Sequence, residues 1–349
     1  MKIKTNLIAH YERYPKLQIE DILKYIYQSA FGPEHLISNR SAVENFIKHE
    51  FTEMDDTMCQ VIEELDGGYS RVSLDLISEG MSIETLAKIF CLSARNEQCG
   101  KEKLINALEI ARELVKNGKL PFSAVEFDQK VASWADSGYE ALHHSEIFRS
   151  EYKPHYRVIS SKYAPFMSFF AEIDRLTEKG NAIIAIEGGS ASGKTTLGKM
   201  LEEIYDCNVF HMDDFFLRPE QRTPERFAEA GGNVDRERFL SEVLIPLSEG
   251  REVRFRRFDC SKQELEAPLA VTPKRLNFVE GAYSMHPSLE KYYDFSLFID
   301  ISPEKQRERI LVRNSEQQAK RFFEEWIPYE LRYFSETNIK DRCKMIIMQ

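Results

Sequence analysis

The residues best suited to chemistry are the eight from Gly188 to Thr195, which fit the phosphate-binding Walker A pattern G-x-x-x-x-G-K-[ST] at every fixed position. Backbone N–H groups of such a loop curl around the β-phosphate of a nucleotide, and the helix that follows points its positive end at the anion. Lys194 is expected to contact the β- and γ-phosphates, and Thr195 to offer its hydroxyl to Mg²⁺. The residues predicted to bind the nucleotide are Gly188, Gly189, Ser190, Ala191, Ser192, Gly193, Lys194, Thr195 and Thr196.

The sequence on either side of this loop favours a nucleotide site over an ordinary Gly/Ser turn. A continuous apolar run at 182–186 precedes the loop, and a helical pattern at 194–205 follows it. A strand, a loop and a helix in this order are the context that the motif requires. The motif therefore predicts binding of a nucleoside triphosphate and Mg²⁺, but it does not distinguish ATP from GTP.

Acidic residues follow two further candidate strands. Asp213 and Asp214 come after the strand predicted at 207–211, and Glu280 comes after the one predicted at 276–279. Open parallel sheets hold their ligands at the carboxyl ends of the strands. A kinase that acts on a hydroxyl needs one carboxylate to accept or orient the proton and another acid near Mg²⁺. Because neighbouring side chains in a strand-to-loop segment point in different directions, we expect different roles for the two aspartates.

Arginines follow a helix start at Ser302-Pro303. Arg309 and Arg313 are four residues apart, so they share one face of the predicted helix. Arginines in this position can neutralise the charge that develops on a transferred phosphoryl group. The alternative is a solvated helix face, because glutamates are interleaved with these arginines.

From about residue 181 to the C-terminus, the chain resembles the uridine kinase / phosphoribulokinase family of P-loop kinases. The resemblance covers about half of the chain, and it combines the Walker A loop with an Asp-x-Phe-[FY] motif and a strand that ends in Glu-Gly. The segments that carry it are 188–195, Asp213-Asp214-Phe215-Phe216, Asn233-Val234-Asp235, Phe258-Asp259, Val279-Glu280-Gly281 and Arg309 to Arg313.

The resemblance implies a role for each segment. Asp213 would activate the acceptor hydroxyl, Glu280 would help to hold Mg²⁺, and Asp235 would contact a sugar hydroxyl. A lid around residues 313–325 would supply the arginines. The expected catalytic residues are Lys194, Asp213, Arg309 and Arg313; the expected acceptor contacts are Asp213, Asp214, Asp235 and Asp259; the expected metal ligands are Thr195 and Glu280.

Departures from the nucleoside kinases leave the acceptor open. No histidine follows Asp259 closely, and Asp235 continues into Arg-Glu-Arg instead of the usual His-Pro-Asp. The arginines at 254, 256 and 257 would suit a phosphorylated or carboxylated acceptor. Strand alternation would place the last of them on the opposite face from the other two, so they cannot all point into one site. The Asp-Asp-Phe-Phe segment is also similar to that of nicotinamide riboside kinases.

Histidines gather in two clusters of the N-terminal half. One contains Glu34 and His35, and the other contains His143, His144 and His155. Together they suggest a metal or phosphate site. Packing is the competing interpretation, because adjacent histidines on a regular element do not easily share one metal. This half faintly resembles uncharacterised helical domains of bacterial proteins, so a second catalytic domain, an effector-binding module and a dimerisation module all stay open.

The elements that must position these residues differ between the two halves. Helical periodicity dominates up to about residue 178, whereas short apolar runs alternate with helical patterns after it. We therefore predict an α/β chain with a mostly α-helical domain, 1–165, before a P-loop NTPase domain with a parallel doubly wound sheet, 166–349. The predicted helices are 19–30, 82–94, 101–116, 166–179, 194–205, 235–248 and 303–313, and the predicted strands are 182–186, 207–211, 253–258, 276–279 and 296–301.

Composition excludes several classes of protein. The 349 residues carry a formal charge of −10, which disfavours binding to nucleic acid through general basicity. No apolar run approaches the roughly 18 residues of a membrane span, and the first ten residues lack the apolar core of a signal peptide. None of the six cysteines forms a CxxC pair. We expect a cytoplasmic protein with no membrane or nucleic-acid partner, and homo-oligomerisation stays open.

Two functions are compatible with these patterns. The first is an ATP- and Mg²⁺-dependent phosphotransferase acting on a hydroxyl of a small metabolite such as a nucleoside, a riboside or a sugar phosphate. The second is a regulatory NTPase whose nucleotide state controls partner or effector binding by the N-terminal domain. The acceptor motifs favour the kinase, because a switch does not need them.

Overall fold

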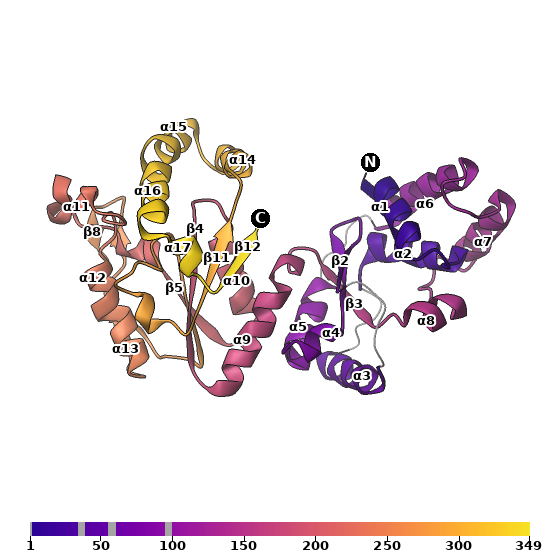
Figure 1. The fold of residues 1–349 in the computed structure, drawn as a ribbon, viewed down its shortest axis with the longest axis horizontal. Coiled ribbons are helices and arrows are strands. Elements are labelled where there is room, and N and C mark those ends of the chain that lie inside the picture. Colours follow the sequence, from indigo (N-terminus) through magenta and orange to yellow (C-terminus); the bar gives the residue numbers. More distant parts are fainter. Residues whose placement is uncertain (1, 34–38, 55–60, 95–99) are drawn as a thin grey trace. The chain divides into compact units, whose positions relative to one another are not determined.

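The structure is a computed structural model that describes residues 2–33, 39–54, 61–94 and 100–349. The chain divides into two compact units, Met1–Asp174 and Arg175–Gln349, which we call the N-terminal unit and the C-terminal unit (Figure 1). The division falls within helix α9 (Met167–Lys179), whereas the boundary expected from the sequence lies shortly before this helix. Each unit is described by itself.

Helices form most of the N-terminal unit, as predicted. Its core lies between α2 and α6, whose apolar stripes face each other. Ser82 caps α5 by accepting a hydrogen bond from the backbone N–H of Thr85, as its position in the sequence suggested. The helices before α9 are α1 (Lys2–Arg13), α2 (Ile19–Phe31), α3 (Arg40–Glu53), α4 (Asp75–Ser78), α5 (Ile83–Ser93), α6 (Gly100–Lys116), α7 (Ala124–Asp136) and α8 (Glu146–Tyr152).

A small antiparallel sheet in this unit was not predicted. Its order is β1 (Ile62–Glu64), β2 (Tyr69–Ser73) and β3 (Tyr156–Ser160). Every residue of β2 is buried, including Arg71, whose guanidinium pairs with the buried carboxylate of Glu63 at 3.0 Å. A strand that is buried on both faces and rich in polar residues shows neither alternation nor an apolar run, so its sequence carries no strand signal.

The C-terminal unit contains the predicted parallel sheet. Its order is β12-β11-β4-β10-β5, and every neighbouring pair is parallel. β4 is therefore central, and the loop that follows it emerges at the carboxyl edge of the sheet, where open α/β sheets bind ligands. The strands are β4 (Ala182–Gly188), β5 (Cys207–His211), β10 (Leu276–Glu280), β11 (Phe295–Asp300) and β12 (Met345–Met348).

Helices cover this sheet. α10 contacts β4, β5 and β10. Phe239 and Val243 of the α12–α13 region belong to the same buried cluster as Ile183 and Ala185 of β4. A π-helical turn, Leu240–Leu244, joins α12 to α13, and another, Phe322–Trp326, joins α15 to α16. The helices are α10 (Lys194–Ile204), α11 (Pro224–Ala228), α12 (Arg236–Phe239), α13 (Ile245–Ser248), α14 (Pro303–Arg313), α15 (Glu316–Arg321), α16 (Ile327–Thr337) and α17 (Ile339–Arg342).

Two details of the predicted sheet were wrong. The run 253–258 is not a strand of the main sheet, because it divides between two separate two-stranded sheets. These pair β6 (Val253–Phe255) with β9 (Leu269–Val271), and β7 (Phe258–Asp259) with β8 (Glu264–Leu265). The edge strand β12 was missed, because it is short and lies after the last recognised motif. Across the described ranges, no helix is long and apolar enough to span a membrane.

Candidate active site

The Walker A loop begins where β4 ends. Gly188 has a φ of +148°, and a Cβ at this position would lie 2.5 Å from the carbonyl oxygen of Ile299 in β11. Glycine is therefore required for the backbone to pass this close to the neighbouring strand. Gly193 has a φ of +109° and immediately precedes α10, so the N-terminus of that helix faces the loop. The hydroxyl of Ser192 is buried in the loop and has no hydrogen-bond partner among the described residues.

Lys194 lies folded against the loop that it follows. Its ammonium donates to the carbonyl oxygens of Gly188 at 2.8 Å and Gly189 at 2.9 Å, and the side chain is buried. A lysine has three N–H donors, so one is left for a phosphate oxygen. The chain thus holds a positive charge at the start of α10, which is the arrangement expected for this motif.

The two expected metal ligands lie together. The hydroxyl of Thr195 donates to Oε1 of Glu280 at 3.1 Å, and Nδ1 of His211 lies 2.6 Å from the same oxygen. Strand register explains this contact, because Glu280 of β10 is paired with His211 of β5. A hydroxyl and a carboxylate fit Mg²⁺, which takes one or two protein oxygens together with substrate phosphates. Sequence analysis gave His211 no role, although it directly precedes the acidic motif.

Asp213 and Asp214 differ in their surroundings, as expected. Asp213 is accessible to solvent, but desolvation by the surrounding protein raises its pKa above the ordinary value, while the nearby charges of Lys194 and His211 oppose this increase. Asp214 forms an ion pair with Arg257 at 3.2 Å, and partial burial raises its pKa. Of these two aspartates, Asp213 is therefore the one that has no ion-pair partner among the described residues.

The other two expected acceptor contacts are engaged in local structure. Asp235 is 2% exposed and caps α12 by accepting a hydrogen bond from the backbone N–H of Arg238, while its other oxygen accepts one from Gln221 at 2.9 Å. Asp259 accepts hydrogen bonds from the backbone N–H and the hydroxyl of Ser261, which hold the pKa of Asp259 below its usual range. The charge of Asp213 affects the pKa of Cys260, the residue after Asp259. The turn that contains Asp259 and Cys260 therefore lies near the predicted base.

The two predicted catalytic arginines have different environments. Arg309 donates to the carbonyl oxygens of Ala191 at 3.0 Å and Ser192 at 3.2 Å, so it braces the Walker A loop. Arg313 is exposed, and its guanidinium lies 5.8 Å from the centre of the Phe322 ring. Among the described residues, no contact of Arg313 with the Walker A loop is found, in contrast to Arg309.

Sequence analysis missed Glu187, which directly precedes the loop. Its carboxylate is fully buried and accepts hydrogen bonds from the backbone N–H groups of Gly188, Tyr283 and Met285 and from the hydroxyl of Tyr333. Burial raises the pKa of Glu187 to about 7. An acid at the end of an otherwise apolar strand was a signal of such a role.

Removal of this carboxylate is expected to destabilise the C-terminal unit. Glu187→Ala leaves buried donors without an acceptor, which costs about 3 kcal/mol and corresponds to a fall in Tm of roughly 6–12 °C. Thermal unfolding followed by circular dichroism measures this effect. The exposed Glu202 provides the control, and equal Tm values for Glu187→Ala and Glu202→Ala would contradict the anchoring role.

Glu330 of α16 was also missed, and no sequence motif marks it. Its carboxylate accepts hydrogen bonds from the backbone N–H of Ser190 at 2.9 Å and from the hydroxyl of Ser190 at 2.6 Å. Burial raises the pKa of Glu330, and the charges of Lys194 and Asp213 also affect it. The Glu330 carboxylate therefore occupies two hydrogen-bond donors of the phosphate-binding loop, the N–H and the hydroxyl of Ser190.

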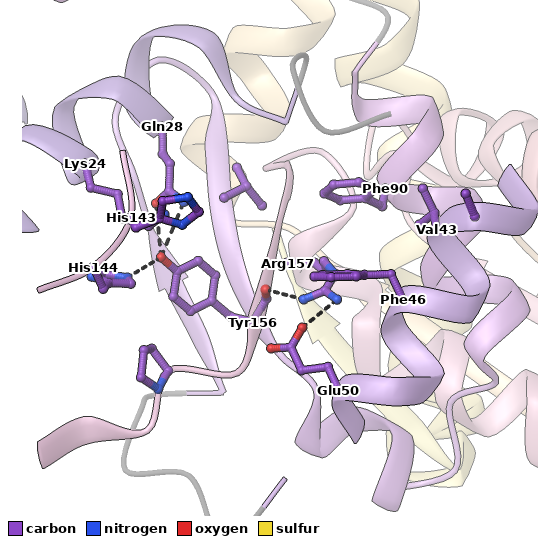
Figure 2. Close-up of a pocket in the computed structure, with 13 residues that line it drawn as sticks. Lys24, Gln28, Val43, Phe46, Glu50, Phe90, His143, His144, Tyr156 and Arg157 are labelled. Carbon is purple, nitrogen blue, oxygen red and sulfur yellow. Dashed lines mark hydrogen bonds and ion pairs between the residues drawn. The ribbon is translucent and has the colours of Figure 1, made fainter. Parts of the chain in front are cut away.

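The histidines of the two predicted clusters do not come together. His144 contacts Tyr156 (Figure 2) and Asp21, whereas His155 contacts Glu50 at 3.0 Å. His143 is exposed. Glu34 and His35 lie outside the described residues. Within the described residues, no group of three or more His, Cys, Asp or Glu is arranged to hold a metal ion.

Comparisons with known proteins match the C-terminal unit. The model of the phosphoribulokinase / uridine kinase family matches residues 183–321, which confirms the resemblance seen in the sequence. A uridine kinase from Chlamydia pneumoniae is 28% identical over 149 residues, which are 39% of this chain and 65% of that protein. The chain thus spans slightly less than two thirds of that relative's length.

A solved structure from Bacillus stearothermophilus, described as that of a possible uridine kinase, is also similar. It is 19% identical, with a TM-score of 0.38, and the match covers 50% of this chain and 97% of that one.

Proposed function

We propose, from the match of residues 183–321 to the phosphoribulokinase / uridine kinase family, that the C-terminal unit transfers the γ-phosphoryl group of ATP to a hydroxyl of a small metabolite. The observation that carries the proposal is the meeting of Lys194, Asp213 and the Thr195–Glu280 pair. They come from the ends of β4, β5 and β10, which are neighbours in the sheet. This combination serves transfer to an alcohol, whereas a nucleotide switch needs no acceptor base.

Thr195 and Glu280 would hold Mg²⁺ beside the nucleotide. The metal, when bound, neutralises charge on the β- and γ-phosphates. Lys194 would place its remaining N–H donor on a phosphate oxygen while it stays bonded to the loop carbonyls. Arg309 would hold the loop in shape by its bonds to residues 191 and 192.

Asp213 would accept the proton of the acceptor hydroxyl. As the hydroxyl oxygen attacks the γ-phosphorus, its proton moves to the carboxylate and the bond to the β-phosphate oxygen breaks to release ADP. A raised pKa makes the carboxylate a stronger base than a free aspartate, which suits this step. Asp214 would instead stay paired with Arg257 and shape the acceptor side of the site.

The acceptor would approach beside the turn at 259–263. The charges of Arg222 and Arg321 affect the pKa of Cys260 in the turn that neighbours Asp213, but Arg321 is itself paired with Glu325 at 3.4 Å. The charge of Arg222, which has no carboxylate partner among the described residues, favours an acceptor that carries a phosphate or carboxylate in addition to its hydroxyl. A sugar phosphate or a carboxylated riboside therefore fits this side better than an uncharged nucleoside.

Glu330 is expected to weaken nucleotide binding. Its carboxylate lies on Ser190, so it repels the phosphates, whereas a glutamine keeps an acceptor for the Ser190 N–H without the charge. Glu330→Gln is expected to lower the Kd of MgATP about three- to tenfold, or ~1 kcal/mol. Titration calorimetry measures the change, and Glu336→Gln, at an exposed position of the same helix, is the control. A higher Kd for Glu330→Gln would show that the carboxylate supports the loop instead.

The proposed activity is tested by detection of the phosphorylated product. The protein is incubated with MgATP and single acceptors from a panel of nucleosides, ribosides and sugar phosphates, and ³¹P NMR follows the new phosphomonoester. One acceptor is expected to give a product signal together with ADP. Hydrolysis to inorganic phosphate with every acceptor would instead favour the regulatory NTPase.

A further inference from the structure

The N-terminal unit contains a cavity of about 470 Å³ between α2, α3, α5 and β3, a volume typical of sites for small molecules. Its two sides differ in character. Figure 2 shows Lys24, Gln28, His143 and His144 on one side and Val43, Phe46 and Phe90 on the other, with Tyr156 between them.

A chain of hydrogen bonds fixes the polar side of this cavity. Asp21 accepts hydrogen bonds from the backbone N–H and the hydroxyl of Ser145, and these and its contact with His144 lower the pKa of Asp21. The carboxylate is therefore ionised, and Nδ1–H of His144 donates to it at 2.8 Å. This leaves Nε2 of His144 to accept the hydrogen bond of the Tyr156 hydroxyl at 2.6 Å.

Arg71 lies behind Tyr156. Its guanidinium is 4.7 Å from the centre of the Tyr156 ring, and its Nε donates to Gln28 at 2.9 Å. Nη2 of Arg71 is buried and has no hydrogen-bond partner in the described part of the chain. The hydroxyl of Tyr156 is thus held in place in front of a buried Arg71–Glu63 ion pair.

Lys24 supplies a positive charge on the cavity wall. Its ammonium donates to the carbonyl oxygen of Leu142 at 2.7 Å, and among the described residues no carboxylate lies within ion-pair distance of it. Burial, together with the charge of Arg71, lowers the pKa of Lys24 to about 8. By contrast, Arg157, the other strong base on the wall, is paired with Glu50 at 2.7 Å. A half-buried ammonium with two further donors is suited to an anion.

The opposite wall offers an apolar surface. Phe46 is 67% exposed and is the one aromatic residue among the exposed large hydrophobic side chains of the described ranges. Phe90, by contrast, is 1% exposed and lies within the wall, and the guanidinium of Arg157 lies 5.1 Å from the centre of the Phe46 ring. Exposed aromatic surface at a cavity is typical of a site that packs on a flat ligand.

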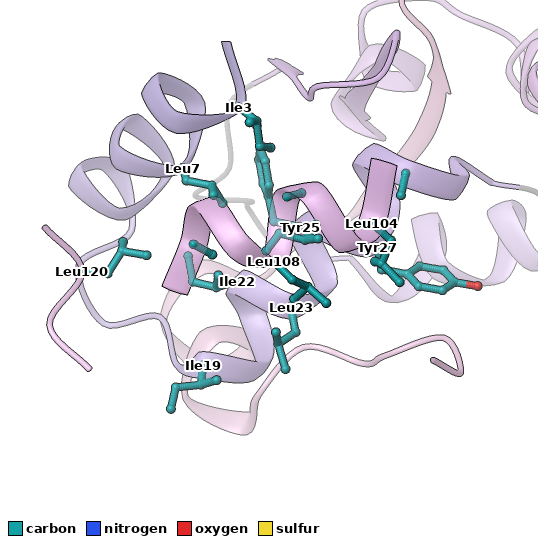
Figure 3. Close-up of a cluster of buried hydrophobic side chains, with 14 of the residues drawn as sticks. Ile3, Leu7, Ile19, Ile22, Leu23, Tyr25, Tyr27, Leu104, Leu108 and Leu120 are labelled. Atoms are coloured by element: carbon teal, nitrogen blue, oxygen red, sulfur yellow. The ribbon is translucent and has the colours of Figure 1, made fainter. Parts of the chain in front are cut away.

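The helix that carries the polar wall is firmly anchored. Ile22 and Leu23 of α2 pack with Leu104 and Leu108 of α6 in the core (Figure 3). Lys24 and Gln28 are four residues apart and share the remaining face. The site is therefore built on a rigid element, which favours binding without rearrangement.

We propose that this cavity is a second ligand site, which binds a small organic anion with a flat apolar part. The anionic group, a carboxylate or a phosphomonoester, pairs with Lys24, and the flat part packs on the exposed ring of Phe46. The proposal depends on the N-terminal unit alone and is independent of the kinase activity.

The test is titration calorimetry of the full chain with two probes, phenyl phosphate and benzoate. We expect at least one probe to bind, and inorganic phosphate and phenol, which each lack one half of the ligand, to bind about tenfold more weakly or worse. Lys24→Met is expected to weaken the better probe about tenfold, and Phe46→Ala to weaken it several-fold. The exposed Lys116→Met is the matched control and should leave the affinity unchanged.

One further measurement separates this site from the Walker A loop. Lys194→Met must bind the probe as the wild type does, because loss of binding would place the probe on the Walker A loop and overturn the proposal. Absence of binding by both probes, or full affinity in a folded Lys24→Met protein, would also overturn it. Phe46 is exposed, so its variant remains informative even where Lys24→Met does not fold.

The pH dependence provides a second readout. Affinity is expected to fall as pH rises through about 8, because Lys24 loses its charge there, while both probes keep theirs, since the second pKa of a phosphomonoester is about 6. Lys24→Arg should remove this fall. The groups that face Lys24 or the cavity are Asp21, Glu50, Arg71, His143, His144, Arg149, Tyr156 and Arg157. A fall that persists in Lys24→Arg would assign the titration to one of these groups and contradict the role of Lys24.

Discussion

Asp213→Asn is expected to lower the kcat of phosphoryl transfer by roughly 10²–10⁴-fold, because the amide cannot accept the proton of the acceptor hydroxyl. Nucleotide affinity should not change measurably, because the contacts of the loop with the phosphates do not involve this side chain. Asparagine has nearly the same shape as aspartate, and Asp213 is accessible to solvent, so the variant is expected to fold. Steady-state rates with a saturating acceptor and calorimetric titration with ATP measure the two quantities.

The neighbouring aspartate provides the most informative control for this variant. Asp214 is one residue away but is paired with Arg257. Asp214→Asn should therefore raise the KM of the acceptor more than it lowers kcat. An exposed control is Asp206→Asn, in the turn before β5. Equal kcat values for Asp213→Asn and the wild type would remove Asp213 from the base role.

Lys194→Met is expected to lower kcat by roughly 10²–10³-fold, because the ammonium is the cation that the loop holds nearest to the developing phosphoryl charge. The side chain is buried, and its two donors to Gly188 and Gly189 shape the loop. The Kd of ATP should therefore also rise. Rapid-quench measurement of a single turnover separates the effect on the chemical step from the effect on binding.

Folding must be monitored in this variant. Methionine leaves two loop carbonyls without their donor, so the Tm is recorded alongside the rate. Lys199→Met, at an exposed position of the same helix, is the matched control. Single-turnover rates that are equal in Lys194→Met and Lys199→Met would contradict the role of Lys194.

The sequence allowed prediction of those candidate site residues that lie in a fixed local pattern. The Walker A spacing predicted the loop, and the predicted strand ends placed Asp213 and Glu280 at the edge of the sheet where open α/β sheets bind ligands. Sequence reasoning did not reach Glu330, because this contact depends on how α16 packs on the loop, about 140 residues later in the chain. Such long-range packing leaves no local pattern.

Local motifs were less informative where a polar residue has a structural use. Asp235 fits a sugar-binding motif, yet its carboxylate caps α12 and accepts from Gln221, and both uses look the same in a sequence. In the N-terminal unit, His143 and His144 are adjacent in sequence but differ in burial, and the role of His144 in the polar wall of the cavity depends on its contacts with Asp21 and Tyr156. Asp21 lies on α2, far from both histidines in the sequence, so spacing gave no indication of it.

The central claim is transfer of phosphate to an acceptor rather than turnover of nucleotide alone. It is tested most directly by the rate of ADP release from MgATP with and without each acceptor, in the wild type and in Asp213→Asn. The account predicts that one acceptor increases the rate strongly in the wild type and that Asp213→Asn loses this increase. A slow rate that is the same with every acceptor and in both proteins would contradict it, and would identify the C-terminal unit as a nucleotide switch.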